Sequence, residues 1–235
     1  MAKKKSGAGR AAARLSVVPA PLADLAKLVK TVTWPKSWVI HRIHLKIYSG
    51  NEFNPGLKGN ARFSPIKASG GASIPTLYGG TTFDCAAMET IFHDIPFSAG
   101  LKTFDKWKLT DQVYSQLTLK RDLKLADLSA TALRKLGVQR NELIDTEKDK
   151  YPDTRKWAEA IHAVCPDAEG LLWVSRQDDR AFAVVLFGDR VAPADLLPTG
   201  GPYSVSADVT IYTDVLALAE RIGVDIVGGR QQGSQ

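Results

Sequence analysis

Cysteine is scarce in this sequence, since Cys85 and Cys165 are its only two among 235 residues. Neither lies in a CxxC pair, so the sequence indicates no zinc site, no redox motif and no disulfide framework. Their isolation is typical of buried apolar thiols. Stability must then come from a hydrophobic core, which a chain of this length with 44% hydrophobic residues can build.

Long hydrophobic runs are also missing. No stretch of about 18 apolar residues occurs, so the sequence predicts no transmembrane helix. The N-terminus is basic, but no hydrophobic segment of the kind found in secretory signal peptides follows it. We therefore expect a cytoplasmic protein with no membrane partner.

Several common catalytic and nucleotide-binding motifs are absent. The sequence has no GxGxxG, Walker, HExxH or GxSxG pattern. Its four histidines form no metal-ligand set, because His41 and His44 fall on opposite faces if their segment is a strand. We expect neither a bound metal ion nor a prosthetic cofactor.

Charge is unevenly distributed along the chain. Lys3, Lys4, Lys5, Arg10 and Arg14 give the first 14 residues five positive charges and no acid. The remainder has 26 basic and 25 acidic residues, which leaves it a net charge of +1 out of a total of +6. We expect residues 1–16 to be a disordered arm and residues 17–235 to form one globular domain. A solvated leader is favoured for the arm, with nucleic-acid contact as the alternative.

The periodicity of the remaining chain predicts an α+β fold. Strands outnumber crossover helices and no regular βαβ alternation appears, which favours a mixed, largely antiparallel sheet with flanking helices. Helices are predicted over 20–30, over 83–93 with Thr81 or Thr82 as the cap, after Ser129, from Pro152 to Pro166, and over 213–222. Strands are predicted over 38–48, 61–64, 75–79, 104–120, 123–126, 170–175, 181–187 and 205–212.

Some polar residues stand out against this pattern. Arg42 lies within an apolar strand, where a guanidinium needs either an anionic partner or an exposed edge position. Arg62 raises the same question. Glu89 shares a small, apolar helix face with Cys85 and Ala86, and the alternative for it is a margin position that reaches water. Ser175 ends an apolar strand and, taken alone, is an ordinary turn serine.

Taken in order, these segments resemble the RES domain family, which is named for its arginine, glutamate and serine. HRIH carries Arg42, NARFSPI carries Arg62, PTLYGGTTFDCAAMETIFHD carries Tyr78 and Glu89, and GLLWVSRQDDRAFAVVLF carries Ser175. The resemblance covers roughly residues 38–190. Relatives often have a tyrosine after the first arginine and a Gly-Arg-Trp second motif, where this chain has Ile43 and Ala61-Arg62-Phe63.

The resemblance implies an ADP-ribosyltransferase-like core and a toxin that degrades NAD+ by hydrolysis or phosphorolysis. NAD+ is then a substrate and not a bound cofactor. The resemblance gives Glu89, Arg42 and Ser175 catalytic positions and implies that Arg42, Arg62, Tyr78 and Ser175 bind NAD+. A carboxylate at Glu89 would stabilise the positive charge that develops on the ribose. The two guanidinium groups suit a pyrophosphate, Tyr78 the nicotinamide ring, and Ser175 the ribose or the nicotinamide amide.

The implied partner is a helix-turn-helix antitoxin of the Xre type that covers the active site. Nucleic acid would then be contacted only through the antitoxin, and a homo-oligomer is possible. Two other functions remain open from the sequence. The chain could transfer ADP-ribose to a protein, or it could be a binding module without turnover that acts through its basic arm.

Overall fold

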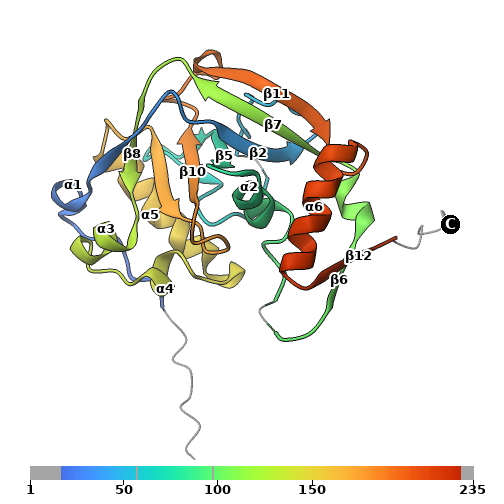
Figure 1. The fold of residues 1–235 in the computed structure, drawn as a ribbon. Coiled ribbons are helices and arrows are strands. Elements are labelled where there is room, and N and C mark those ends of the chain that lie inside the picture. The colour runs from blue at the N-terminus through green and yellow to red at the C-terminus, as the bar shows by residue number, and fades with distance from the viewer. Residues whose placement is uncertain (1–16, 57, 97, 229–235) are drawn as a thin grey trace, which may run out of the picture.

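The structure is a computed structural model that describes residues 17–56, 58–96 and 98–228. Its strands are β1 (Thr31–Trp34), β2 (Ile40–Leu45), β3 (Ile66–Lys67), β4 (Ser73–Ile74), β5 (Thr76–Gly80), β6 (Lys102–Asp105), β7 (Gln112–Leu119), β8 (Leu123–Asp127), β9 (Gly170–Val174), β10 (Phe182–Phe187), β11 (Leu196–Ser204) and β12 (Val224–Val227). Within the described residues, eight strands form one curled sheet in the order β1-β8-β9-β10-β5-β2-β7-β11 (Figure 1). β8 and β9 run parallel, and the other neighbours in this sheet are antiparallel. The predicted α+β class with a largely antiparallel sheet is confirmed.

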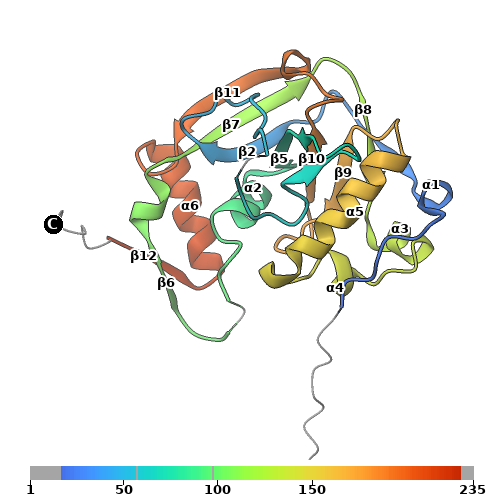
Figure 2. The ribbon, with the colours of Figure 1, turned by 180° about the vertical axis from the view of Figure 1, so that it is seen from behind.

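Helices cover both ends of this sheet. They are α1 (Leu25–Leu28), α2 (Phe83–Thr90), α3 (Ala130–Lys135), α4 (Arg140–Leu143), α5 (Tyr151–Val164) and α6 (Val209–Arg221), with short 3-10 turns η1 (Lys106–Leu109), η2 (Lys148–Lys150) and η3 (Pro193–Asp195). α5 lies across β9 and β10, whereas α6 lies beside α2 and the small parallel sheet of β12 and β6 (Figure 2).

The core follows from the alternation of side chains along the strands. Leu171 and Trp173 of β9 pack on the side of α5, together with Trp157 of that helix. Leu172 points the other way and packs with Val184 on the opposite face of the sheet. A further apolar cluster joins α2 and α6. Strands that are buried on both faces read as continuous apolar runs, which is why 170–175 and 181–187 were recognisable.

The structure confirms the helix predicted over 83–93 in type and corrects its extent. α2 begins after Thr82, whose side chain accepts a hydrogen bond from the Cys85 N–H at 3.0 Å. The helix ends at Thr90, three residues earlier than predicted, and Ile91 is its C-cap. Glu89 therefore stands in the last turn of a short helix with a defined start.

Four predicted elements are wrong. Residues 104–120 do not form one strand, because the 3-10 turn η1 (Lys106–Leu109) separates β6 from β7. The helix expected over 20–30 is helical only at Leu25–Leu28. Thr31–Trp34, for which no strand was predicted, forms β1, because its β-branched residues suit a strand. Residues 61–64 are a tight turn closed by backbone hydrogen bonds between Ala61 and Ser64. The strand expected over 205–212 includes the start of α6, since the Asp208 side chain caps that helix by accepting from the Ile211 N–H at 3.0 Å.

Two further expectations concerned the N-terminal arm and membrane-spanning helices. The basic arm predicted for residues 1–16 lies outside the described residues. Across the residues that are described, each helix falls short of the length and apolarity needed to cross a bilayer.

Candidate active site

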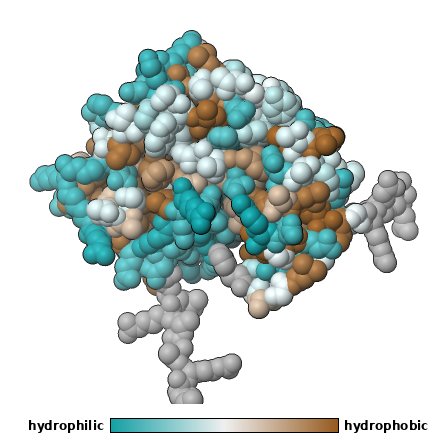
Figure 3. All heavy atoms as spheres, in the orientation of Figure 1, coloured by the Kyte–Doolittle hydropathy of each residue, from teal (hydrophilic) through white to brown (hydrophobic). Residues whose placement is uncertain are grey.

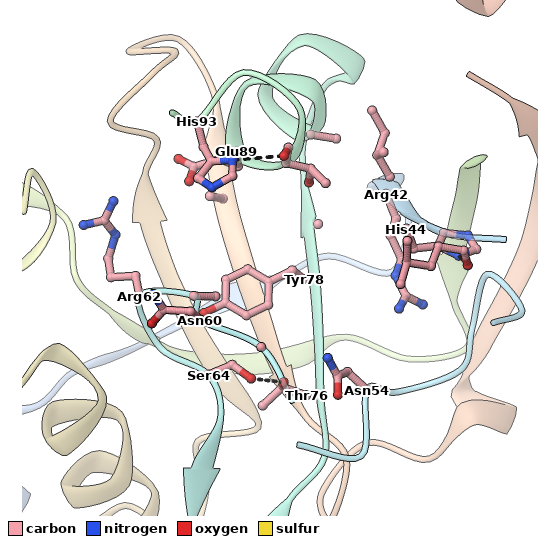
Figure 4. A pocket seen from close by; sticks show the side chains of 18 of the residues that line it. Arg42, His44, Asn54, Asn60, Arg62, Ser64, Thr76, Tyr78, Glu89 and His93 are labelled. Atoms are coloured by element: carbon pink, nitrogen blue, oxygen red, sulfur yellow. Dashed lines mark hydrogen bonds between the residues drawn. The ribbon is translucent and has the colours of Figure 1, made fainter. Parts of the chain in front are cut away.

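The candidate site lies where two neighbouring strands of the large sheet separate. Among the described residues, β2 and β5 are paired at one position, His41 opposite Gly80. Gly79 permits this close crossing, since a Cβ there would lie 2.4 Å from Ile40 Cγ2 and 3.0 Å from the His41 carbonyl oxygen. Beyond the crossing a cavity of about 320 Å³ opens, which Figure 4 shows from close by.

Side chains from distant parts of the sequence line this cavity. β2 contributes Arg42, β5 contributes Tyr78, and α2 contributes Glu89. Arg62 comes from the turn before β3. Figure 4 shows Tyr78 in the middle of the view, with Arg62 on one side, Arg42 on the other, and Glu89 above. Four of the five residues that the sequence singled out thus line this cavity, and the fifth, Ser175, lies behind Glu89 and contacts its carboxylate.

Arg42 is a buried cation held by backbone carbonyls. Its Nη1 donates to the carbonyl oxygens of Gly50 at 2.5 Å and Glu52 at 2.8 Å, and more weakly to that of Ser49 at 3.5 Å. Among the described residues, no carboxylate forms an ion pair with it. Burial lowers the pKa of Arg42 to about 10, against the opposing effect of the Glu52 charge, so the guanidinium stays charged at neutral pH.

His44 lies beside Arg42 on the same face of β2 and is neutral. Its Nδ1 donates to the Leu45 carbonyl oxygen at 3.0 Å, which leaves Nε2 to accept from the Ser115 hydroxyl at 2.9 Å. Burial, and then the charge of Arg42, lower the pKa of His44 to about 4. His44 therefore adds no second positive charge to this wall of the cavity.

Arg62 is the second buried cation. Its Nη1 donates to the Thr146 hydroxyl at 2.9 Å and to the Thr146 carbonyl oxygen at 3.3 Å. Its Cζ lies 5.3 Å from the centre of the Tyr151 ring. The Nε atom is buried without a hydrogen-bond partner, and no carboxylate pairs with the guanidinium in the described part of the chain.

Tyr78 is fixed at both ends of its side chain. Its hydroxyl accepts a hydrogen bond from the Phe63 N–H at 2.8 Å, and its ring meets the Trp173 ring edge-on at 6.2 Å. Burial raises the pKa of Tyr78, so the hydroxyl stays neutral. The ring is a rigid apolar surface within the cavity.

Glu89 and Ser175 form the most specific contact in the site. The Ser175 hydroxyl donates to Glu89 Oε1 at 2.7 Å and accepts from the backbone N–H groups of Gln177 at 3.0 Å and Asp178 at 3.1 Å. Ser175 is fully buried, whereas the Glu89 carboxylate lines the cavity. Among the described residues, no donor contacts Glu89 Oε2. Ser175 therefore orients the Glu89 carboxylate. The expected contact between Ser175 and a ligand stays a prediction.

The sequence reasoning did not identify several other residues of the site. Thr146 holds Arg62 and also accepts, through its carbonyl oxygen, from Arg176 at 2.8 Å. Tyr151, Arg176 and Gln177 line the cavity itself. Arg176 directly follows Ser175, so its position was a usable signal, but no local pattern marks Thr146. Within the described ranges, no group of three or more His, Cys, Asp or Glu residues could hold a metal ion.

Comparisons with known proteins agree with this picture. No curated protein matches the sequence. Among solved structures, the chain is similar to one from the M. tuberculosis MbcT–MbcA toxin–antitoxin complex, with a TM-score of 0.53 and 14% identity over 80% of this chain and 92% of that one. At this identity the likeness concerns the fold. The sequence profile of the RES domain matches residues 38–208, which include every residue of the candidate site described above. The chain belongs to the RES domain family.

Proposed function

We propose that this protein is a toxin that cleaves the bond between nicotinamide and ribose in NAD+. One observation carries the proposal. Two buried guanidinium groups, Arg42 and Arg62, line one cavity without a carboxylate partner in the described residues, and an oriented carboxylate, Glu89, lines the same cavity. Buried cations of this kind are costly unless an anion completes them. A pyrophosphate is such an anion, and Glu89 would stand by the sugar.

The chemistry of NAD+ suits these residues. The nicotinamide ring is cationic in the substrate and leaves as a neutral molecule, so no strong general acid is required. The ribose passes through an oxocarbenium-like state, whose positive charge a fixed carboxylate stabilises. Glu89 is fixed in this sense, because Ser175 holds its Oε1 while its Oε2 has no donor among the described residues. The rigid Tyr78 ring offers a stacking surface for nicotinamide.

A partner follows from the same proposal. The similar solved structure is that of a toxin–antitoxin complex. By analogy, we infer that a helix-turn-helix antitoxin of the Xre type covers the cavity of this chain, and that nucleic acid is reached only through that antitoxin. The toxin would act in the cytoplasm, on the cellular pool of NAD+.

The test is release of nicotinamide from NAD+ by the purified full chain, freed of any antitoxin. Glu89→Gln should reduce the rate by a factor of about a hundred or more, because it removes the charge while keeping the shape of the side chain. Glu220→Gln, on the exposed face of α6, is the matched control and should leave the rate unchanged.

No nicotinamide release from the well-folded wild-type chain would reject the proposed activity. NAD+ labelled in its adenylate part separates cleavage from transfer. Label that stays on a macromolecule would instead establish an ADP-ribosyltransferase.

A further inference from the structure

Two arginines meet at a single carbonyl oxygen in the wall of the candidate site. The carbonyl oxygen of Thr146 accepts from Arg62 Nη1 at 3.3 Å and from Arg176 Nη1 at 2.8 Å. Thr146 is buried, and its hydroxyl accepts from the same Arg62 nitrogen at 2.9 Å. The two guanidinium groups are therefore close neighbours, although one comes from the turn before β3 and the other from the turn after β9.

Both guanidinium groups reach the cavity of the candidate site. Arg62 and Arg176 belong to its lining residues, and so does Tyr151. Arg62 is buried, and its Nε has no hydrogen-bond partner in the described part of the chain. Burial raises the pKa of Tyr151, and the positive charges of Arg62 and Arg176 both oppose that rise. The two charges therefore act on the same stretch of the cavity wall.

The repulsion between these two cations is balanced only in part. Glu147 forms an ion pair with Arg176, but the Glu147 side chain is 76% exposed, whereas that of Arg176 is 14% exposed. For Arg62, the described residues supply no carboxylate. Glu147 also lies outside the cavity of the candidate site, in the lining of a second cavity of about 590 Å³ that Arg176 borders as well. One carboxylate thus stands against two adjacent cations, an arrangement that a further anion would stabilise.

The cavity of the candidate site carries an excess of positive charge. Among its described lining residues, Arg42, Arg62 and Arg176 are the arginines, and Glu89 is the carboxylate that faces them. Arginine stays protonated at neutral pH, so the excess amounts to two charges. A pyrophosphate between two nucleosides carries two negative charges, one on each phosphate, and matches this excess.

We propose that Arg176 and Arg62 together bind the pyrophosphate of the substrate, and that Glu147 competes with it for the charge of Arg176. This inference rests on the proposed function, to which it adds a further arginine and an internal competitor. A guanidinium presents its N–H donors in one rigid plane, which suits the oxygens of a phosphate. Because the Thr146 carbonyl holds both guanidinium groups, their spacing is fixed before a ligand binds, which lowers the entropic cost of binding.

The first experiment measures the Kd of inorganic pyrophosphate for the full chain by isothermal titration calorimetry. Arg176→Gln should raise this Kd about tenfold or more, because a charged contact is lost. The matched control is Arg180→Gln, which removes the same charge from the same turn outside both cavities and should leave the Kd unchanged. No binding of pyrophosphate to the well-folded wild type, or equal binding by Arg176→Gln, would overturn the inference.

A variant that binds more tightly tests the competition without altering a buried residue. Glu147→Gln keeps the shape of the side chain and removes its charge, so pyrophosphate should bind about twofold to fivefold more tightly, as expected for an exposed ion pair. The control is Asp149→Asn, which removes a charge that pairs with Lys150 in the same turn and should leave the Kd unchanged. Unchanged binding by Glu147→Gln, or an equal gain in both variants, would overturn the role given to Glu147.

Nicotinamide release separates this inference from the proposed function. In Arg176→Gln, KM for NAD+ should rise about tenfold, whereas cleavage of nicotinamide riboside, which has no pyrophosphate, should be unaffected. Release from NAD+ with an unchanged KM in this variant would overturn the inference and leave the proposed function in place. No release from the wild type, together with pyrophosphate binding that depends on Arg176, would reject the proposed function and leave the anion site.

Discussion

At the scale of single residues, the hydroxyl of Ser175 shows how a buried group acts through its neighbour. It has one proton to donate, which goes to Glu89, and its lone pairs accept from two backbone N–H groups. Every hydrogen bond that this hydroxyl can make is therefore used within the protein. The contact joins the last turn of α2 to the turn after β9, and it fixes the direction of the carboxylate.

Replacing this serine should separate orientation from binding. In Ser175→Ala, kcat for nicotinamide release should fall by about tenfold to a hundredfold with KM little changed, because Glu89 loses its fixed position. The free energy of unfolding should drop by about 1–3 kcal/mol, since the partly buried N–H groups of Gln177 and Asp178 lose their acceptor. Steady-state kinetics and urea unfolding measure the two effects. The control is Ser129→Ala, which removes the α3 cap and should lower stability without changing kcat or KM. A rise in KM without loss of kcat in Ser175→Ala would contradict the orienting role of Ser175.

His44 makes stability depend on pH. Its pKa is about 4 in the folded protein and near 6.5 when unfolded, so between these values the unfolded chain binds the extra proton. Stability is therefore present above pH 6.5 and is lost as the pH falls towards 4. Between pH 7.5 and pH 5 this one group should account for a loss of about 2 kcal/mol.

The measurement is urea unfolding of the wild type and of His44→Gln at these two pH values. The glutamine keeps both a donor and an acceptor but does not titrate, so the variant should lose about 2 kcal/mol less than the wild type. His41, whose pKa burial also lowers, remains in both proteins and cancels in the comparison. Equal losses in the two proteins would show that His44 does not titrate in this way.

At the scale of elements, the crossing of β5 over β2 determines where the cavity opens. Gly79→Ala should lower the free energy of unfolding by about 1–3 kcal/mol, because the new methyl group overlaps Ile40 and the His41 carbonyl. It should also weaken NAD+ cleavage, since the strands carrying Arg42 and Tyr78 are pushed apart. Gly70→Ala is the matched control, because a Cβ there has no neighbour within 4 Å. The measurements are thermal or urea unfolding and the rate of nicotinamide release for both variants. Equal stability of Gly79→Ala and Gly70→Ala would contradict the importance of the close contact at Gly79.

The elements that the sequence predicted well are those with strong local signals. A cap at Thr81 or Thr82 predicted the start of α2, and the structure shows that it is Thr82. The continuous apolar runs predicted β9 and β10. β1 was missed because its four residues gain their stability from pairing with β8, which lies far away in the sequence. The start of α6 was predicted to be a strand, and its residues Val209, Thr210 and Ile211 are β-branched. In the fold the Asp208 side chain caps a helix there instead.

At the scale of the whole molecule, the basic arm and the candidate site are separate in the sequence. Every side chain that lines the two cavities falls between residues 42 and 183. Deletion of residues 2–14 should therefore leave nicotinamide release unchanged while lowering the net charge by five. Enzyme kinetics on the truncated chain tests this. If the deletion removed the cellular effect and Glu89→Ala did not, the binding-module hypothesis would be favoured instead.

The sequence predicted which residues belong to the site, but it did not predict which of them contact one another. The order of the motifs identified Arg42, Arg62, Tyr78 and Glu89, and all four line one cavity. Other side chains hold these residues in place through contacts between segments that are far apart in the sequence. Examples are the contact of Thr146 with Arg62 and that of Ser175 with Glu89. Such pairings follow from the folded sheet, and no spacing in the sequence encodes them.

The one position at which the described parts of β2 and β5 pair has a mechanical consequence. Arg42 stands on one side of that separation, held by the carbonyl oxygens of the loop 49–52. Arg62 and Glu89 stand on the other side, where Arg62 is bound to Thr146 and Glu89 to Ser175 in the turn after β9. A ligand that contacts both arginines would connect the two sides. It would make the sheet more rigid between β2 and β5, where backbone pairing is sparsest. Occupancy of the site and rigidity of the sheet would then rise together.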